Sequence, residues 1–131
     1  MIVLDTHVWV WWLSDFQPLS PTVKRLLNEA KSKNAIYISS ISVWEVAQLT
    51  IRGRLELTMD YRDWITQAEH LPFLNFVPID NKIALKSVQL PSPLHQDPAD
   101  RLIIATAMML GAPLITKDKQ ISKYPHVTTI W

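Results

Sequence analysis

Short runs of apolar residues alternate along this chain with longer segments in which apolar residues recur every three or four positions. The short runs are typical of buried strands, and the longer segments are typical of helices with one apolar face. The predicted strands cover residues 2–4, 35–38, 76–79, 113–116 and 127–130. Strands that alternate with helices indicate right-handed βαβ units, so we expect an α/β fold with a parallel sheet covered by helices on both faces.

Capping residues and helix breakers limit the predicted helices. Ser, Asp and Pro stand at several expected starts, where a side-chain oxygen accepts free N–H groups and proline fits the first helical position. The helices include residues 8–13, 20–30, 43–53, 60–68, 80–88 and 98–110. Asp15-Phe16-Gln17-Pro18 closes the first of them. Pro78 places the third strand at an edge of the sheet, because proline has no N–H to donate.

The last long helix begins with acidic residues and is apolar on nearly all sides. Asp97 precedes a proline and is the predicted N-cap, and Asp100 falls within the first turn. Residues 102–110 are mostly apolar or small, and Gly111 follows them as the C-terminal stop. A helix that is apolar all round is buried. Its two carboxylates therefore lie at the mouth of the core, either as a cap and a partner of the helix dipole or as part of a site.

Other acidic residues follow the predicted strands closely. Asp5 comes directly after the first strand, Glu45 is placed in the first turn of the helix after the second, and Asp118 follows the fourth. Because the carboxyl ends of parallel strands share one edge of a sheet, we expect these side chains to gather there with Asp100. Each acid also has a structural interpretation: Ser42-Val43-Trp44-Glu45 matches a capping box, and aspartates fit turns and caps. A structural role for any one acid is easily expected, but it is far less expected that all four would gather at one edge of the sheet by chance.

Converging carboxylates repel one another and favour a bound cation. Oxygen ligands in a chain with no cysteine favour Mg²⁺ or Mn²⁺ over Zn²⁺. The four histidines, at positions 7, 70, 95 and 126, show no metal-ligand spacing. His7 and His95 fall near the acidic edge, where they either assist or make local hydrogen bonds. A metal on such a cluster activates water and stabilises charge on a phosphate, so the pattern indicates phosphodiester hydrolysis.

Composition narrows the function classes. The length of 131 residues indicates one domain over residues 1–131. A net charge of +1 is too small for a protein that coats nucleic acid with basic side chains. With only two glycines, the chain lacks the glycine-rich phosphate loops of dinucleotide-binding and Walker-type proteins. It shows neither a signal-peptide pattern nor an apolar run that spans a membrane, so we expect a soluble, cytoplasmic protein.

Six tryptophans are many for a small core, and Trp9, Trp11 and Trp12 stand close together. Tryptophan is enriched at interfaces, and neighbouring helical positions cannot all face inward. We therefore expect at least one of these three side chains to lie on a partner surface, while core packing accounts for the others.

Four segments carry further information when they are taken together. Leu4-Asp5-Thr6-His7, Ser42-Val43-Trp44-Glu45, the stretch from His95 to Ala105 and Thr116-Lys117-Asp118 follow one another over nearly the whole chain. This arrangement resembles the PIN domain and, within that family, the VapC-type ribonuclease toxins of bacterial and archaeal toxin–antitoxin pairs.

The resemblance implies a three-layer α/β/α fold with a parallel sheet of about five strands. It also implies a divalent-metal-dependent endoribonuclease that hydrolyses RNA with a metal-activated water. The implied metal-binding and catalytic acids are Asp5, Glu45, Asp100 and Asp118, with Thr6 and Thr116 as supporting hydroxyls. Finally, it implies a homodimer and a small antitoxin that covers the site and ties the complex to promoter DNA.

Two other interpretations remain open. In a phosphoaspartyl enzyme, Asp5 would be the nucleophile and Lys117 would bind phosphate. Haloacid-dehalogenase-type phosphatases, however, have a second aspartate two residues after the first, where this chain has His7, and the paired acids of receiver domains are also missing. The other alternative is a non-catalytic PIN-fold module for interaction or RNA binding. Loss of an acid is the expected mark of such a module, and all four acids are present.

Overall fold

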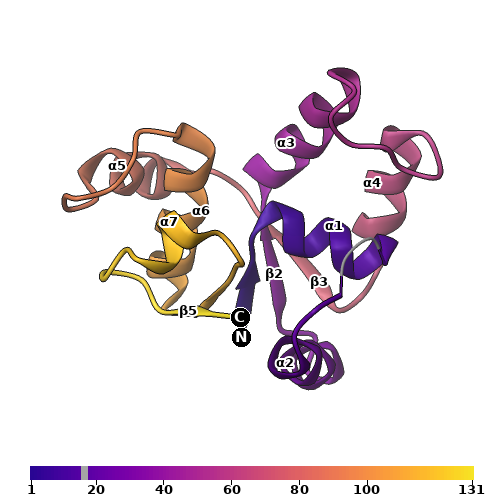
Figure 1. Ribbon diagram of the computed structural model, residues 1–131, viewed down its shortest axis with the longest axis horizontal. Coiled ribbons are helices and arrows are strands. Elements are labelled where there is room, and N and C mark those ends of the chain that lie inside the picture. Colours follow the sequence, from indigo (N-terminus) through magenta and orange to yellow (C-terminus); the bar gives the residue numbers. More distant parts are fainter. Residues whose placement is uncertain (16–17) are drawn as a thin grey trace.

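The structure is a computed structural model that describes residues 1–15 and 18–131. In this range, parallel strands form a five-stranded sheet in the order β3-β2-β1-β4-β5 (Figure 1). The strands are β1 (Ile2–Leu4), β2 (Ile36–Ser39), β3 (Leu74–Val77), β4 (Leu114–Ile115) and β5 (Thr129–Ile130). The predicted α/β class and parallel sheet are confirmed.

At least one helix connects each strand to the next strand along the chain. They are α1 (Thr6–Ser14), α2 (Pro21–Ser32), α3 (Ser40–Ile51), α4 (Tyr61–Glu69), α5 (Asn81–Gln89), α6 (Pro98–Leu110) and α7 (Lys119–Ser122). Within the described residues, no helix combines the length and apolarity that a bilayer crossing requires. Positions 16 and 17 of the segment expected to close α1 lie outside the described residues.

The predicted N-caps of α2, α4, α5 and α6 are confirmed. In each case the capping side chain accepts a backbone N–H of the first turn; the residues are Ser20, Asp60, Asp80 and Asp97. Gly111 ends α6 with a φ of 63°, in the left-handed region that glycine adopts without strain. These local signals therefore identify most of the helix starts and the end of the most buried helix.

Several elements differ from the prediction by one or a few residues, and the differences at β3 and α7 have clear reasons. β3 begins two residues before position 76 and ends at Val77, because Pro78 has no N–H with which to continue the ladder. Its predicted edge position is confirmed. α7 is a short helix that the sequence pattern indicated only as a turn, and Asp118 is its N-cap.

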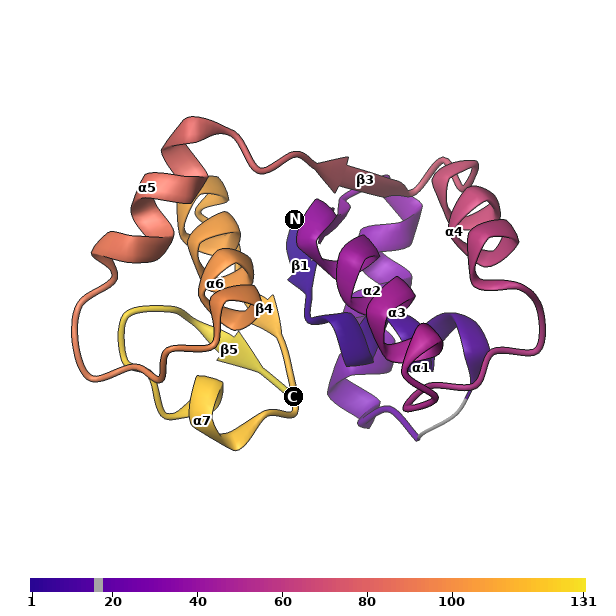
Figure 2. The same ribbon diagram turned by 90° about the horizontal axis from the view of Figure 1, so that it is seen from above.

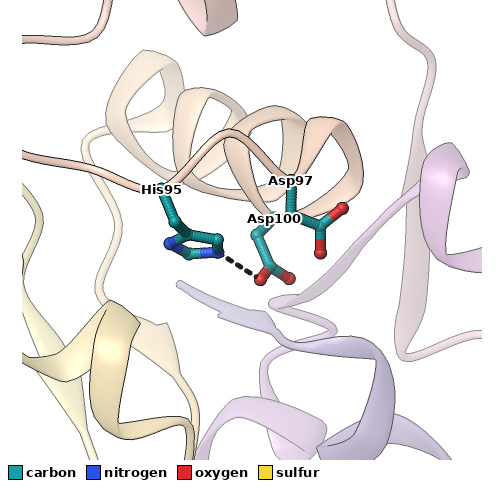
Figure 3. A group of neighbouring side chains, drawn as sticks. All are labelled: His95, Asp97 and Asp100. Atoms are coloured by element: carbon teal, nitrogen blue, oxygen red, sulfur yellow. Dashed lines mark hydrogen bonds and ion pairs between the residues drawn. The ribbon is translucent and has the colours of Figure 1, made fainter.

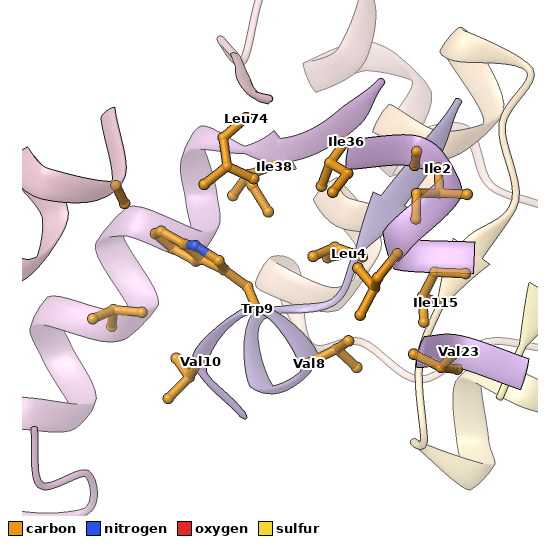
Figure 4. Close-up of a cluster of buried hydrophobic side chains, with 14 of the residues drawn as sticks. Ile2, Leu4, Val8, Trp9, Val10, Val23, Ile36, Ile38, Leu74 and Ile115 are labelled. Atoms are coloured by element: carbon orange, nitrogen blue, oxygen red, sulfur yellow. The ribbon is translucent and has the colours of Figure 1, made fainter. Parts of the chain in front are cut away.

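Alternate residues of β1 point to opposite faces of the sheet. Leu4 packs with side chains of α1 and α2, whereas Val3 packs with Ile103 of α6. Figure 2 shows α2 and α6 on opposite sides of the sheet. Figure 4 shows the first of these clusters around Trp9, which is fully buried and lies 4.8 Å from Trp64 between ring centres. The three-layer α/β/α arrangement is therefore confirmed.

The order of strands reverses beside β1. The chain continues from β1 to β2 and β3 on one side, and then places β4 and β5 on the other. Ligands of open α/β sheets bind outside the carboxyl ends of the strands at such a reversal. Leu4 pairs with Ile115 at the ends of β1 and β4, so Asp5 and Thr116 follow at the reversal itself.

Candidate active site

Asp5 lies where β1 ends and α1 begins. Its Oδ1 accepts the Thr6 N–H at 2.7 Å and caps α1, and its Oδ2 accepts the Thr116 hydroxyl at 2.7 Å. The residue is only 6% exposed, and burial raises the pKa of Asp5. The Thr116 hydroxyl, His7 and the Thr6 N–H oppose this rise because they stabilise the ionised form. The fold thus holds a buried carboxylate by both of its oxygens.

A hydroxyl network joins the start of α1 to α3. Thr6 Oγ1 lies 2.5 Å from Glu45 Oε1 and 2.8 Å from Ser42 Oγ. A hydroxyl has one proton and an ionised carboxylate only accepts, so Thr6 donates to Glu45 and accepts from Ser42. Thr6 and Thr116, the two hydroxyls that the resemblance implied, therefore each contact one of the acids.

Glu45 does not lie in the first turn of its helix. Ser39 is the N-cap and its side chain accepts the Ile41 N–H, so α3 begins at Ser40 and Glu45 lies in the second turn. The first-turn prediction and the capping-box interpretation of Ser42 are wrong, because β2 extends to Ser39 and the chain turns into the helix at once. The side chain of Ser42 contacts Thr6 instead.

The charge environment of Glu45 links it to the other acids. Burial raises the pKa of Glu45, and the Thr6 hydroxyl opposes this rise. The negative charges of Asp5 and Asp97 raise the pKa further. Glu45 therefore faces acids that come from the end of β1 and the start of α6.

Three side chains gather at the N-terminal end of α6 (Figure 3). His95 Nε2 lies 2.8 Å from Asp100 Oδ2, and one ligand atom each from His95, Asp97 and Asp100 lie within 4.8 Å of one another. Asp97 also accepts the Ala99 N–H at 3.2 Å. Asp97 is thus both the predicted cap and a member of the acidic group, so the two interpretations of this carboxylate apply together.

Asp100 shows the effect of crowded charge most clearly. Burial raises the pKa of Asp100 to about 7, although its contact with His95 opposes the rise. The charges of Asp5, Asp97 and Glu45 contribute to the rise. Crowded carboxylates of this kind favour either protonation or a cation. The charges of Asp5 and Glu45 thus act on Asp100, whereas the ligand atoms that lie within 4.8 Å of one another are those of Asp100, Asp97 and His95.

Asp118 lies at the outer side of this group. Its Oδ1 accepts the N–H groups of Gln120 and Ile121 at 2.8 and 3.0 Å, so the turn-cap interpretation is confirmed. Thr116 Oγ1 accepts the Asp118 N–H at 3.0 Å and donates to Asp5. The charge of Asp118 also raises the pKa of Asp5, so this exposed carboxylate acts on the same cluster.

Comparison with known proteins agrees with this geometry. Residues 2–127 match the PIN domain family. This chain belongs to the PIN domain family. The chain is 35% identical over 133 residues to Ribonuclease VapC22 of Mycobacterium tuberculosis, a match that covers 99% of this chain and 98% of that protein. The family that the motifs indicated is therefore confirmed.

Solved structures with a similar fold include VapBC2 and FitAcB. VapBC2 from Rickettsia felis, bound to a DNA fragment from its promoter, superposes on this PIN domain with a TM-score of 0.72 and 19% identity, covering 99% of this chain and 98% of that chain. FitAcB from Neisseria gonorrhoeae has a TM-score of 0.70 and 26% identity, covering 100% and 97% of the two chains.

The loop between α5 and α6 of this PIN domain is held at both ends. The Tyr124 hydroxyl donates to the Pro91 carbonyl at 2.8 Å. Arg101 donates from Nε to the Ser87 carbonyl at 2.9 Å and from Nη1 to the His95 carbonyl at 3.3 Å. The Ser87 carbonyl is among the last four of α5, which lack partners within a helix. Arg101 therefore ties the end of α5 to the residue that contacts Asp100.

The donor set of the site fits a hard divalent cation. Among the described residues, the ligand atoms that lie within 4.8 Å of one another are those of His95, Asp97 and Asp100, which offer two carboxylates and one imidazole in a chain without cysteine. Mg²⁺ and Mn²⁺ prefer oxygen ligands, whereas a zinc site normally includes cysteine or several histidines. A cation also offsets the repulsion that, after burial, contributes to the raised pKa of Asp100.

Proposed function

We propose that this PIN domain is a divalent-metal-dependent endoribonuclease and the toxin of a toxin–antitoxin pair. The observation that carries the proposal is the group of acids outside the carboxyl end of the sheet, whose mutual repulsion contributes to raising the pKa of Asp100 to about 7. The relative of 35% identity is named a ribonuclease, which supports RNA as the substrate.

We propose Asp5, Glu45, Asp100 and Asp118 as the acids that hold Mg²⁺ or Mn²⁺. Bound there, a divalent cation supplies Lewis acidity to a phosphodiester and lowers the pKa of water. Asp97 adds negative charge to the same region while it caps α6. The cation held by these acids would supply positive charge next to a phosphate, in a chain whose net charge is only +1.

The other polar side chains orient these acids. The hydroxyls of Thr116 and Thr6 donate to Asp5 and Glu45, and so fix the direction in which each carboxylate faces. His95 contacts Asp100 from the loop that precedes α6. Side chains that are held by such contacts keep an acidic site in one arrangement before substrate arrives.

We also propose that the chain forms a homodimer and binds a small antitoxin that covers the acids, with DNA contacted through the antitoxin. The resemblance to VapC-type toxins supports this assembly, and VapBC2 is a complex bound to promoter DNA. The expectation that one of the clustered tryptophans lies on a partner surface remains a prediction. Trp9 is fully buried, so the side chain that contacts a partner would be that of the half-buried Trp11 or Trp12.

The test is cleavage of mixed RNAs by the purified chain. We expect cleavage with Mg²⁺ or Mn²⁺, none with a chelator, and none with metal in Asp100→Asn. The variant keeps the size of the side chain, so its melting temperature shows whether the fold is intact. A chain that binds RNA but cleaves none with either metal would overturn the proposal in favour of a non-catalytic module.

A further inference from the structure

A cavity of about 340 Å³ opens beside the acids, and its lining residues come from the end of β1, from α1 and from the two residues that precede α7. It is lined by Asp5, His7, Val8, Trp11, Lys117 and Asp118. Two of these residues belong to the proposed metal-binding acids, so a group inside the cavity lies next to the reacting phosphate. The rest of the lining is aromatic or aliphatic with one cation, and the hydrolysis of a phosphodiester does not account for it.

Two rings of α1 form an aromatic wall in this cavity. His7 and Trp11 are four residues apart and therefore share a helix face, with ring centres 5.9 Å apart. The Trp11 ring also meets Trp131 edge to face at 6.1 Å, which supports it from another side. His7 is exposed and Trp11 is half-buried, in contrast to the fully buried Trp9. The wall is thus both held in place and accessible.

Lys117 adds a positive charge at the rim of the cavity. Its Nζ lies 5.6 Å from the centre of the Trp131 ring, a cation–π distance. The side chain is exposed and follows Thr116 directly, one residue before Asp118. A cation in this place favours an anionic group near the acids, while the apolar wall favours an uncharged ring.

We propose that this cavity binds the base of a nucleotide that flanks the scissile phosphate, with Trp11 and His7 stacking on the base and Lys117 contacting a backbone phosphate. The inference rests on the proposed ribonuclease function and states how RNA lies on that site. Proteins bind single-stranded nucleic acid by combining aromatic side chains, on which bases stack, with cations that contact phosphates. Since a base must leave its own stack to enter the cavity, the bound RNA is single-stranded there.

The test compares two fluorescent probes that carry the same phosphates. One is a short oligouridylate, and the other is the same ribose–phosphate backbone with hydrogen in place of every base. Binding is measured by anisotropy in Asp100→Asn with Mn²⁺, so that neither probe is cleaved. The ratio of the two dissociation constants then measures how much the bases contribute to the affinity. We expect the oligouridylate to bind about 5- to 150-fold more tightly, as one stacked base contributes ~1–3 kcal/mol.

Variants made in the Asp100→Asn background show whether the aromatic wall causes this difference in affinity. Trp11→Leu lowers the ratio towards one, and Trp11→Phe keeps most of it because an aromatic face remains. His7→Leu, at an exposed position, lowers the ratio by a smaller factor without touching the core. Trp12→Leu, on the same helix as Trp11, is the matched control and keeps the ratio, because the Trp12 ring packs against Phe73 at 5.6 Å and does not line the cavity.

Lys117→Met gives the opposite signature. It weakens binding of both probes by the same factor and leaves their ratio unchanged, because a phosphate contact does not depend on the base. A changed ratio in this variant would contradict the assignment of Lys117 to phosphate.

A parent ratio near one, or an unchanged ratio in Trp11→Leu, overturns the base-binding site. If Trp11→Leu keeps the ratio but sediments as a smaller species than the parent, the wall is an interface between copies and the proposal is wrong. Failure of the ribonuclease function itself is seen separately, as no metal-dependent cleavage by the wild-type chain. Probe binding does not depend on that cleavage.

Discussion

The two sides of the acid cluster are held in different ways. At the end of β1, Asp5 has both oxygens bonded, by the Thr6 N–H and the Thr116 hydroxyl, and is almost fully buried. At the start of α6, Asp100 is contacted by His95, and its side chain is 17% exposed. The first acid is fixed by strand pairing, whereas the second depends on the loop that carries His95.

This difference separates the parts of the site that the sheet determines from those that a loop determines. β1 and β4 pair directly, so the position of Asp5 beside Thr116 follows from the sheet. The contact of His95 with Asp100 instead requires Arg101 and Tyr124 to hold the loop at both ends. We therefore expect changes at Asp5 to act on stability as well as cleavage, and changes at the loop to act mainly on metal affinity.

The largest effect is expected at the start of α6, where two aspartates stand three residues apart. Asp100→Asn abolishes cleavage and leaves the melting temperature of the metal-free protein unchanged or raised, because it removes crowded charge. Asp97→Ala costs about 1 kcal/mol of stability as a lost cap and leaves much of the cleavage. Asp97→Asn keeps the cap and removes only the charge. The inverse pattern, with Asp97 essential and Asp100 dispensable, would show that Asp97 is the site residue and that our assignment of Asp100 is wrong.

The second prediction compares two replacements of Asp5. Asp5→Asn loses cleavage but still accepts the Thr6 N–H, while Thr116 turns to accept from the new amide. Asp5→Ala leaves both donors without a partner in a buried place, so it is less stable than Asp5→Asn by about 1–3 kcal/mol. Urea unfolding of the two metal-free variants measures this difference. Equal stabilities would show that the two donors find other partners.

The third prediction concerns pH in the metal-free protein. The pKa of Asp100 rises from 3.8 to about 7 on folding, so between these values the folded chain binds a proton that the unfolded chain releases. The stability from this group is fully present below its unfolded pKa and is lost as pH rises through about 7. The melting temperature of the wild type with chelator should therefore fall between about pH 4 and pH 7, and fall less in Asp100→Asn. Parallel curves for the two proteins would contradict the raised pKa.

The smallest effect is expected at Arg101. Arg101→Met removes the bonds to the Ser87 and His95 carbonyls and lowers Mn²⁺ affinity a few-fold. The affinity of Arg101→Lys should lie between those of the wild type and Arg101→Met. In a His95→Ala background, Arg101→Met should have no further effect, because Arg101 acts through His95. Additive losses of Mn²⁺ affinity in this double-mutant cycle would show that Arg101 acts on the site by another route.

The strand ends and most caps could be predicted because their signals are local. The apolar run before Asp5 and the Asp97-Pro98 pair each identify an element boundary in a few residues. Parallel strands then place Asp5 and Thr116 at the same edge of the sheet, and the pairing of β1 with β4 makes them neighbours. For this reason the position of Asp5 was accessible from the sequence.

The start of α3 and the loop contacts could not be predicted in the same way. Ser39, Ser40 and Ser42 are all suitable caps, and the choice of Ser39 depends on how far β2 pairs with its neighbours. The pairing of His95 with Asp100 depends on a long-range contact, from Tyr124 to Pro91, and on an Arg101 that no local pattern assigns.

The central claim is that these acids together hold a divalent cation. Its most direct test is calorimetric titration of Mn²⁺ into the metal-free wild type and Asp100→Asn at several pH values. We predict wild-type affinity that increases as pH rises to about 7, because binding displaces the proton on Asp100. Asp100→Asn should bind at least about tenfold more weakly and with a smaller pH dependence, which the raised pKa values of Asp5 and Glu45 maintain. Equal affinities in the two proteins would contradict the account.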